Sequence, residues 1–210
     1  MSKTAENKME VYTKIMHEVI NDTMQDLIVT LREKCKDTFL HGRRVADLCI
    51  LVGFEMKLSV QEIEDLALAA FLHDVGKIAV PDRILKKPGA LTDDEMAVMR
   101  THARAGAGVL RVAGGSSESI KALACHHEHY NGKGYPYRLR GENIPFLSRI
   151  ISVADAFDSM TSKRCYAGDL KRKEAIQRLT ACSGTQFDPD ITDVFVDRIN
   201  APKVYMLDAV

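Results

Sequence analysis

Long segments without glycine or proline, each with apolar residues at helical spacing, restrict this 210-residue chain to a helical fold. The longest such segment covers residues 6–36. Its apolar residues recur at the spacing of an amphipathic helix, at Met16, Ile20, Met24, Leu27 and Leu31. No pair of segments shows the alternation that two paired strands require. The chain is therefore predicted to be all-α, with a long N-terminal helix.

Further helices are predicted from cap residues and from the glycines that end them. Ser59 and Glu62 form a capping-box pattern, and Thr92 stands before three acidic residues that suit a helix N-terminus. The predicted helices cover residues 38–53, 59–76, 92–113, 116–130, 146–162, 171–182 and 189–200. The segments 79–91 and 131–145, rich in glycine and proline, are predicted connectors.

Two alternatives are open for the N-terminal helix, residues 1–36. Its apolar stripe packs on the remaining domain, residues 37–210, or part of the stripe forms a seam between two chains of a homodimer. The sequence shows no linker that would separate two cores.

The charge balance and the cysteine content narrow the class of protein. Lysine plus arginine equals aspartate plus glutamate at 29 each, so we expect no cationic surface for a nucleic acid polymer or an anionic membrane. The five cysteines are an odd number without CxxC spacing, which is typical of reduced thiols. No signal peptide is visible, and no apolar run approaches the roughly 20 residues that span a bilayer. We therefore expect a cytoplasmic protein.

Histidine and acidic residues gather in a few short stretches. These residues are His41, His73, Asp74, His102, His126, His127, Glu128, His129, Asp155 and Asp158. Imidazole and carboxylate ligands on several helices suit Mn²⁺ or Fe²⁺, and the missing thiolates disfavour structural zinc. Two such ions would activate water and bind a phosphate. Lys77 follows His73 by about one helical turn and would hold a phosphate oxygen there.

The adjacent pair of His73 and Asp74 has a second interpretation when it is taken alone. A buried hydrogen-bonded dyad without metal would show the same two residues at a helix end. Gly76 ends the predicted helix and allows another segment to approach closely. The interpretation of His73 and Asp74 as metal ligands is favoured only because histidines also stand in the other stretches.

These stretches resemble, in order, the motifs of the HD-GYP family, a branch of the HD metal-dependent phosphohydrolases. FLHDVGKIAVPDRIL resembles its HDxGK stretch, THARAGAGVL its HxxxG helix, and HHEHYNGKGYP the segment that names the branch. SRIISVADAFDSMTSKRCY and GTQFDPDI resemble its closing motifs, so the likeness covers about residues 36–200. The resemblance implies an HD-type helical bundle with a GYP loop.

The resemblance also implies hydrolysis of cyclic di-GMP to pGpG, and often on to GMP, at a centre of two or three iron or manganese ions. The metal ligands that it implies are His41, His73, Asp74, His102, His126, His127 and Asp155. Lys77 would assist the reacting phosphate, and Arg164 would bind a substrate phosphate. Gly134, Tyr135 and Pro136 would form the loop on the substrate side.

Several roles at the centre are expected in more detail. Asp155 would join two metals, and loss of Asp74 would abolish metal binding and catalysis. Asp158 is expected to be a helix cap or a partner of a metal ligand, and Glu128 to orient a ligand. His129 is expected to be solvated at the loop edge. The tyrosine of the GYP loop either contacts the nucleotide or is a half-buried structural residue.

Two positions depart from the family pattern. Asp37 stands where trinuclear members have glutamate, and its shorter side chain favours a binuclear centre, with a third metal at Asp37 as the alternative. Ala167 stands where a basic residue is common, which weakens phosphate binding unless Lys163, Lys171 or Arg172 takes its place.

Two rival functions stay open. The first is hydrolysis of another cyclic dinucleotide, such as 3′,3′-cGMP-AMP. The second is a catalytically weak module that senses cyclic di-GMP or contacts a diguanylate cyclase, which the two departures favour. The family's usual sensory domain does not precede the motifs, so a stand-alone enzyme or one with a separate sensory protein as partner is expected.

Overall fold

The computed structural model describes residues 27–29, 32–33, 36–162 and 172–201. Within these ranges every regular element is a helix. The β-type pairing found there is an isolated bridge between Ser183 and Phe187. The prediction of an all-α fold is confirmed.

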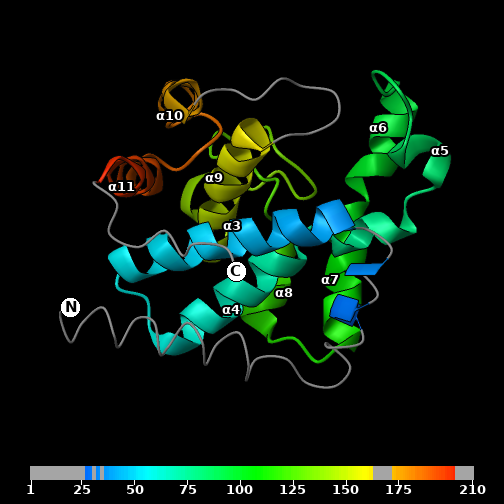
Figure 1. The fold of residues 1–210 in the computed structure, drawn as a ribbon, viewed down its shortest axis with the longest axis horizontal. Coiled ribbons are helices and arrows are strands. Elements are labelled where there is room, and N and C mark those ends of the chain that lie inside the picture. Colours follow the sequence, from blue (N-terminus) through cyan, green and yellow to red (C-terminus); the bar gives the residue numbers. More distant parts are fainter. Residues whose placement is uncertain (1–26, 30–31, 34–35, 163–171, 202–210) are drawn as a thin grey trace.

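Five helices position the residues of the predicted site (Figure 1). They are α3 (Lys36–Glu55), α4 (Val60–Leu72), α7 (His102–Val112), α8 (Ser117–Ala124) and α9 (Phe146–Thr161). α3 crosses the middle of the bundle and packs against both α4 and α9, while α8 packs against α4, α7 and α9. The other elements are α5 (Asp82–Leu85), α6 (Asp93–Arg100), α10 (Arg172–Ala181), α11 (Pro189–Asn200) and the 3-10 helices η1 (Val75–Ala79) and η2 (Gly141–Asn143).

Two helix starts follow the local chemistry that the sequence predicts. The Ser59 hydroxyl accepts a hydrogen bond from the Glu62 backbone N–H, and the Glu62 carboxylate accepts one from the Ser59 N–H. Thr92 and Glu95 form the same arrangement before α6. Both predicted starts are confirmed.

Two predicted helices are too long because local turns interrupt them. The helix predicted over residues 59–76 ends at Leu72, and the chain continues in the tighter turns of η1. The helix predicted over residues 92–113 is divided into α6 and α7 at Thr101. There the Thr101 hydroxyl donates to the Val98 carbonyl, a local hydrogen bond that competes with the regular helical pattern.

A third predicted helix, over residues 116–130, ends at Ala124. Residues 125–127 form a turn, and farther on the backbone N–H groups of Tyr130 and Asn131 donate to the carbonyls of Gln186 and Thr185 rather than to a preceding helical turn. His126 and His127 therefore lie in a turn directly after α8 rather than inside it.

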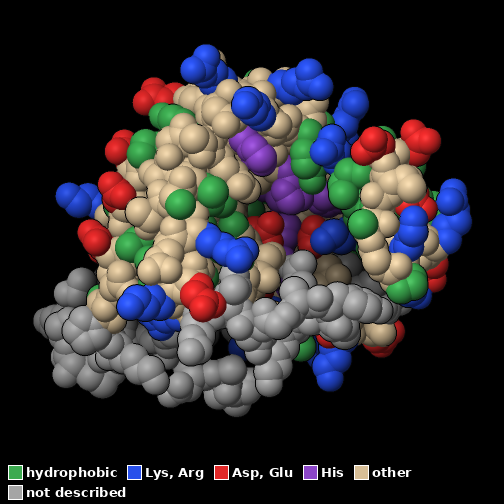
Figure 2. Space-filling view, turned by 90° about the horizontal axis from the view of Figure 1, so that it is seen from above, with side chains coloured by type: hydrophobic (Ala, Val, Ile, Leu, Met, Phe, Trp, Pro, Cys, Tyr) green, Lys and Arg blue, Asp and Glu red, His purple; other side chains and the backbone are tan. Residues whose placement is uncertain are grey.

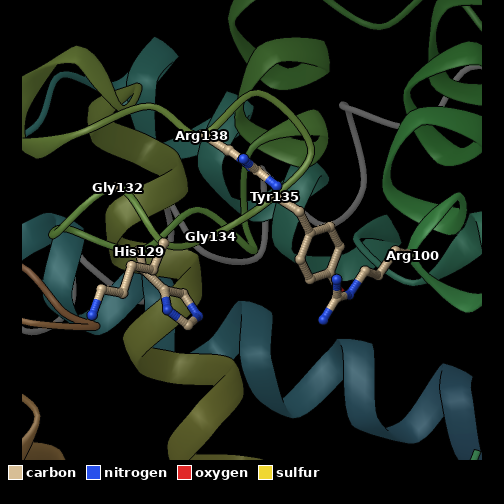
Figure 3. A pocket seen from close by; sticks show the side chains of 7 residues that line it. Arg100, His129, Gly132, Gly134, Tyr135 and Arg138 are labelled. Atoms are coloured by element: carbon tan, nitrogen blue, oxygen red, sulfur yellow. The ribbon is translucent and has the colours of Figure 1, made fainter. Parts of the chain in front are cut away.

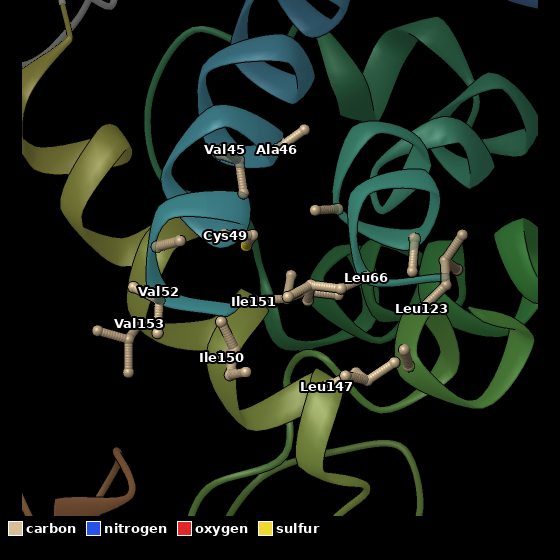
Figure 4. Packing of buried hydrophobic residues seen from close by; sticks show 14 of the residues in the cluster. Val45, Ala46, Cys49, Val52, Leu66, Leu123, Leu147, Ile150, Ile151 and Val153 are labelled. Carbon is tan, nitrogen blue, oxygen red and sulfur yellow. The ribbon is translucent and has the colours of Figure 1, made fainter. Parts of the chain in front are cut away.

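The hydrophobic core lies between α3, α4, α8 and α9 (Figure 4). Ile150 and Ile151 of α9 are fully buried in one cluster with Val45 of α3. Asp155 follows Ile151 by about one helical turn. Core packing of α9 on α3 thus holds Asp155 against His41.

Most of the predicted N-terminal helix lies outside the described residues. Residues 27–29 are helical, and Leu27 and Ile28 pack against the core. The two-chain seam and the boundary at residue 36 stay predictions. None of the helices in the described part of the chain is both long and apolar enough to cross a membrane.

Candidate metal centre

Seven histidine and aspartate side chains meet between α3, α7, α9 and the turns that follow α4 and α8. Their ligand atoms form three groups, each within 4.8 Å: His41, His73 and Asp155; His73, Asp74 and His126; His102, His126 and His127. Because His73 and His126 are shared, the groups form one continuous cluster with two ends. Figure 2 shows histidine side chains at the bottom of a hollow, with lysine and arginine side chains around it. These seven are the ligands that the family resemblance implies.

The backbone orients three of the histidines in the same way. The Nδ1 atoms of His73, His102 and His126 lie 2.7, 2.8 and 2.6 Å from carbonyl oxygens three residues earlier. A carbonyl oxygen only accepts, so each Nδ1 carries the proton and each Nε2 keeps its lone pair. The three Nε2 atoms are therefore in the form that binds a metal ion.

His41 is oriented by a carboxylate instead. Its Nδ1 lies 2.6 Å from Asp158 Oδ2, and Arg44 donates two hydrogen bonds to the same carboxylate at 2.6 and 2.9 Å. Its Nε2 lies 3.0 Å from Asp155 Oδ1. Burial lowers the pKa of His41, but the hydrogen bonds with Asp155 and Asp158 outweigh this and raise it. Asp158 thus acts as a partner of a predicted ligand, which was one of its two expected roles.

Asp74 lies in the middle of the cluster. Its carboxylate oxygens are 3.5 Å from His102 Nε2, 3.6 Å from His73 Nε2 and 3.9 Å from His41 Nε2. Lys77 donates to Asp74 Oδ2 at 2.5 Å. Lys77 was expected to reach this site as part of a longer helix, but α4 ends at Leu72 and the turn of η1 brings Lys77 to Asp74 instead.

Burial and neighbouring charges set the protonation states at the centre. Burial lowers the pKa of His126 and of His102, and lowers the pKa of His127 to about 3. Burial alone would raise the pKa of Asp74, but Lys77 and the nearby histidines hold it well below its usual range. Neutral imidazole and ionised carboxylate are the forms that bind metal ions.

Two ring nitrogens show that the centre fits a bound cation. The Nε2 atoms of His73 and His126 are buried and have no hydrogen-bond partner among the described residues. A buried polar atom without a partner costs about 1–3 kcal/mol. A divalent cation would accept both lone pairs, with the Asp74 carboxylate beside it to balance its charge.

The loop after α8 is held against the centre by Gly134 and Glu128. A Cβ at Gly134 would lie 2.2 Å from the His129 nitrogen and 2.5 Å from the Glu128 Cα, so only glycine permits this approach. The Glu128 carboxylate accepts hydrogen bonds from the backbone N–H groups of Tyr137 and Leu139, at 2.6 and 3.0 Å. Glu128 therefore fixes the loop, and the expectation that it orients a metal ligand is wrong.

Tyr135 lies beside the predicted ligands and is half-buried. The centroid of its ring is 4.8 Å from that of His127, and the guanidinium carbon of Arg100 is 5.3 Å from it. Burial raises the pKa of Tyr135, so the hydroxyl stays protonated and is available as a donor. The peptide bond between Tyr135 and Pro136 is cis.

Other predicted residues lie away from the cluster or beyond the described part. His129 is half-buried and lines a pocket, so it is partly exposed to solvent at the edge of the loop. Asp37 is exposed and belongs to none of the three ligand groups. Arg172 donates to the Ile199 carbonyl. Arg164, Lys163, Ala167 and Lys171 lie outside the described residues.

Two arginines near the centre were not found from the sequence. Arg44 follows His41 by three residues, and this helical spacing could have placed it on the same face. Arg100 reaches the Tyr135 ring from the end of α6 through a tertiary contact, for which the sequence carries no local signal.

Comparison with known proteins identifies the family. The HD domain family model matches residues 16–191. A cyclic di-GMP phosphodiesterase of Thermotoga maritima is 34% identical over 203 residues, which are 93% of this chain and 53% of that protein. A 3′3′-cGAMP-specific phosphodiesterase of Vibrio cholerae is 32% identical over 184 residues, which are 87% of this chain and 35% of that protein.

A solved structure agrees with this assignment at the level of the fold. An HDG"Y"P protein from Bdellovibrio bacteriovorus superposes with a TM-score of 0.66 at 20% sequence identity, over 91% of this chain and 62% of that chain. The chain belongs to the HD domain family, and its resemblance to the HD-GYP branch is confirmed. It spans about half or less of the length of the curated relatives named above.

Proposed function

We propose that the chain is a metal-dependent phosphodiesterase that hydrolyses cyclic di-GMP to pGpG, and on to GMP. The observation that carries the proposal is the cluster of histidine and aspartate ligand atoms in which two buried Nε2 atoms lack a partner among the described residues. The similarity to a cyclic di-GMP phosphodiesterase of Thermotoga maritima supports the choice of substrate.

The proposed cofactor is a pair of divalent iron or manganese ions. The proposed ligands are His41, His73, Asp74, His102, His126, His127 and Asp155. When bound, such ions would activate a water molecule for attack on phosphorus and withdraw charge from the phosphoryl oxygens. A binuclear centre is favoured over a trinuclear one because Asp37, the candidate ligand of a third ion, is exposed.

Lys77 is proposed to hold the reacting phosphate. Its ammonium group is already fixed by Asp74, and 27% of its side chain is exposed toward solvent. A cation that is in place before the substrate binds can stabilise developing negative charge without reorganisation. Arg44 and Asp158 keep the His41 ring in its orientation during turnover.

The substrate side of the site is proposed to be the loop of Gly134, Tyr135 and Pro136. The close backbone approach at Gly134 holds this loop beside His127, and the Tyr135 ring and hydroxyl face a nucleotide. Arg164 is proposed as a further phosphate-binding cation. The proposal includes a cytoplasmic location and a diguanylate cyclase or separate sensory protein as partner.

A second candidate substrate is 3′,3′-cGMP-AMP. It is favoured by the 32% identity to the 3′3′-cGAMP-specific phosphodiesterase of Vibrio cholerae. The ligand cluster serves both substrates equally, since it contacts the phosphodiester and not the bases.

The test is chromatography of both cyclic dinucleotides after incubation with anaerobically purified protein. Asp74→Ala removes the central carboxylate, and Asp82→Ala removes an exposed carboxylate, paired with Lys86, as a matched control. We expect pGpG or GMP from the wild type and from Asp82→Ala, with turnover lost in Asp74→Ala. Full turnover in Asp74→Ala would refute the site. Binding without cleavage would instead establish a sensor, and cleavage of 3′,3′-cGMP-AMP alone would change the substrate.

A further inference from the structure

A pocket next to the metal centre gathers cationic side chains (Figure 3). Its volume is about 490 Å³, which lies in the range of small-molecule sites. Arg100, Lys133 and Arg138 line it together with Tyr135 and His129. Among the described residues no carboxylate lines this pocket. Cationic groups in a concave site without counter-charges attract anions.

Tyr135 connects this pocket to the metal centre. The Tyr135 ring contacts His127, a proposed ligand, with 4.8 Å between the two ring centroids. It also contacts Arg100, whose guanidinium carbon lies 5.3 Å from the Tyr135 ring centroid. In Figure 3 the Tyr135 ring lies between Arg100 and Arg138. An anion in the pocket would therefore be separated from the proposed metal ligands by the Tyr135 ring.

The backbone at Arg138 is built to hold this residue in an unusual conformation. Its φ is +56°, in the left-handed region that non-glycine residues rarely adopt. The residues on both sides, Tyr137 and Leu139, each donate a backbone hydrogen bond to the buried Glu128 carboxylate. Such strain persists where the surroundings fix it, and it is concentrated at ligand-binding sites.

We propose that Arg100 and Arg138 bind the phosphodiester that is not being cleaved. This inference rests on the proposed function. A cyclic dinucleotide carries two phosphodiester groups in one ring, so when one of them lies at the metal centre, the other lies a fixed short distance away and needs a counter-charge. The planar guanidinium group can donate two hydrogen bonds to one phosphate, which makes arginine suitable for this role.

The test compares a substrate that has two phosphodiester groups with one that has a single group. Cyclic di-GMP is the first, and bis(4-nitrophenyl) phosphate is the second. Arg100→Gln, Arg138→Gln and the double variant are compared with Arg111→Gln, which removes an exposed arginine of α7 as a matched control. Hydrolysis of the single diester reports on the metal centre and the fold, because this substrate has no second phosphate.

The expected result is selective. KM for cyclic di-GMP rises about tenfold or more in each single variant, as is typical when a hydrogen bond to a charged group is lost. Turnover of bis(4-nitrophenyl) phosphate stays within about twofold of the wild type in all variants, because this substrate has no second phosphate for the two arginines to bind. Arg111→Gln changes neither substrate's kinetics.

Two results would overturn the inference while leaving the phosphodiesterase intact. One is an unchanged KM for cyclic di-GMP in the double variant, and the other is an equal loss on both substrates. If the wild type cleaves neither substrate, the proposed function fails separately. Calorimetric titration with cyclic di-GMP then tests whether Arg100 and Arg138 bind the substrate. Binding by the wild type that is lost in the double variant supports the inference, and absent binding, or binding that is unchanged in the double variant, refutes it.

Discussion

Replacement of Gly76 by alanine tests how the turn after His73 and Asp74 is held against α7. A Cβ built on Gly76 would lie 1.9 Å from the His102 carbonyl oxygen and 2.5 Å from the Gly106 nitrogen. Both are backbone atoms of a helix, which cannot rotate away as the end of a side chain can. In a Gly76→Ala protein, η1 and α7 must therefore move apart.

The size of the effect follows from this overlap. Overpacking costs about 1–3 kcal/mol, and a clash with backbone belongs at the upper end, about 3 kcal/mol. For a chain of this length each kcal/mol shifts Tm by about 2–4 °C, so Tm should fall by about 6–12 °C. The same movement separates Asp74 from His102, now 3.5 Å apart, so bound metal should fall as well.

Gly108→Ala is the matched control on the same helix. A Cβ at Gly108 meets nothing within 4 Å, and alanine is favoured over glycine inside a helix by about 0.5–1 kcal/mol. This variant should keep its metal and melt about 1–4 °C above the wild type. Thermal unfolding followed by circular dichroism compares the two. A Gly76→Ala protein that melts as high as Gly108→Ala would refute the packing argument.

Three further predictions follow from the contacts around the centre. Asp158→Ala should weaken metal binding about 10–100-fold in a competition assay with a chelator, because His41 loses the group that orients it; equal affinity would contradict this role. Glu128→Ala should lower the free energy of unfolding in urea by about 2–4 kcal/mol, because two loop N–H groups lose a buried acceptor; a loss below about 1 kcal/mol would argue against it. Removal of metal with a chelator should lower Tm, and Mn²⁺ should restore it, because an ion that binds only the folded state stabilises that state; an unchanged Tm would count against a metal centre.

The dense stretches of imidazole and carboxylate groups indicated a metal site, but they also contain Glu128, His129 and Asp158. The choice of seven ligands among these residues came from the family resemblance, and the structure brings those seven into one cluster. The two capping boxes were local, since each depends on two residues three positions apart.

The features that the sequence did not show depend on distant contacts. The helix predicted through residue 76 ends at Leu72, where the chain turns to pack Gly76 on α7. Glu128 stands among histidines in the sequence, yet its partners are loop N–H groups up to eleven residues later. Arg100 reaches Tyr135 only because α6 and the loop are brought together by the fold. Local sequence patterns carry no information on contacts between residues that are distant in the sequence.

The metal content of the purified chain tests the central claim most directly. Protein loaded anaerobically with Fe²⁺ or Mn²⁺ is analysed by elemental mass spectrometry, as wild type and as His73→Ala. His73 belongs to two of the three ligand groups, the one with His41 and Asp155 and the one with Asp74 and His126, so its loss removes a ligand atom from both of them. We expect about two ions per wild-type chain and about one or none in the variant. A wild-type chain without bound ions, or a His73→Ala chain that binds as many as the wild type, would contradict it.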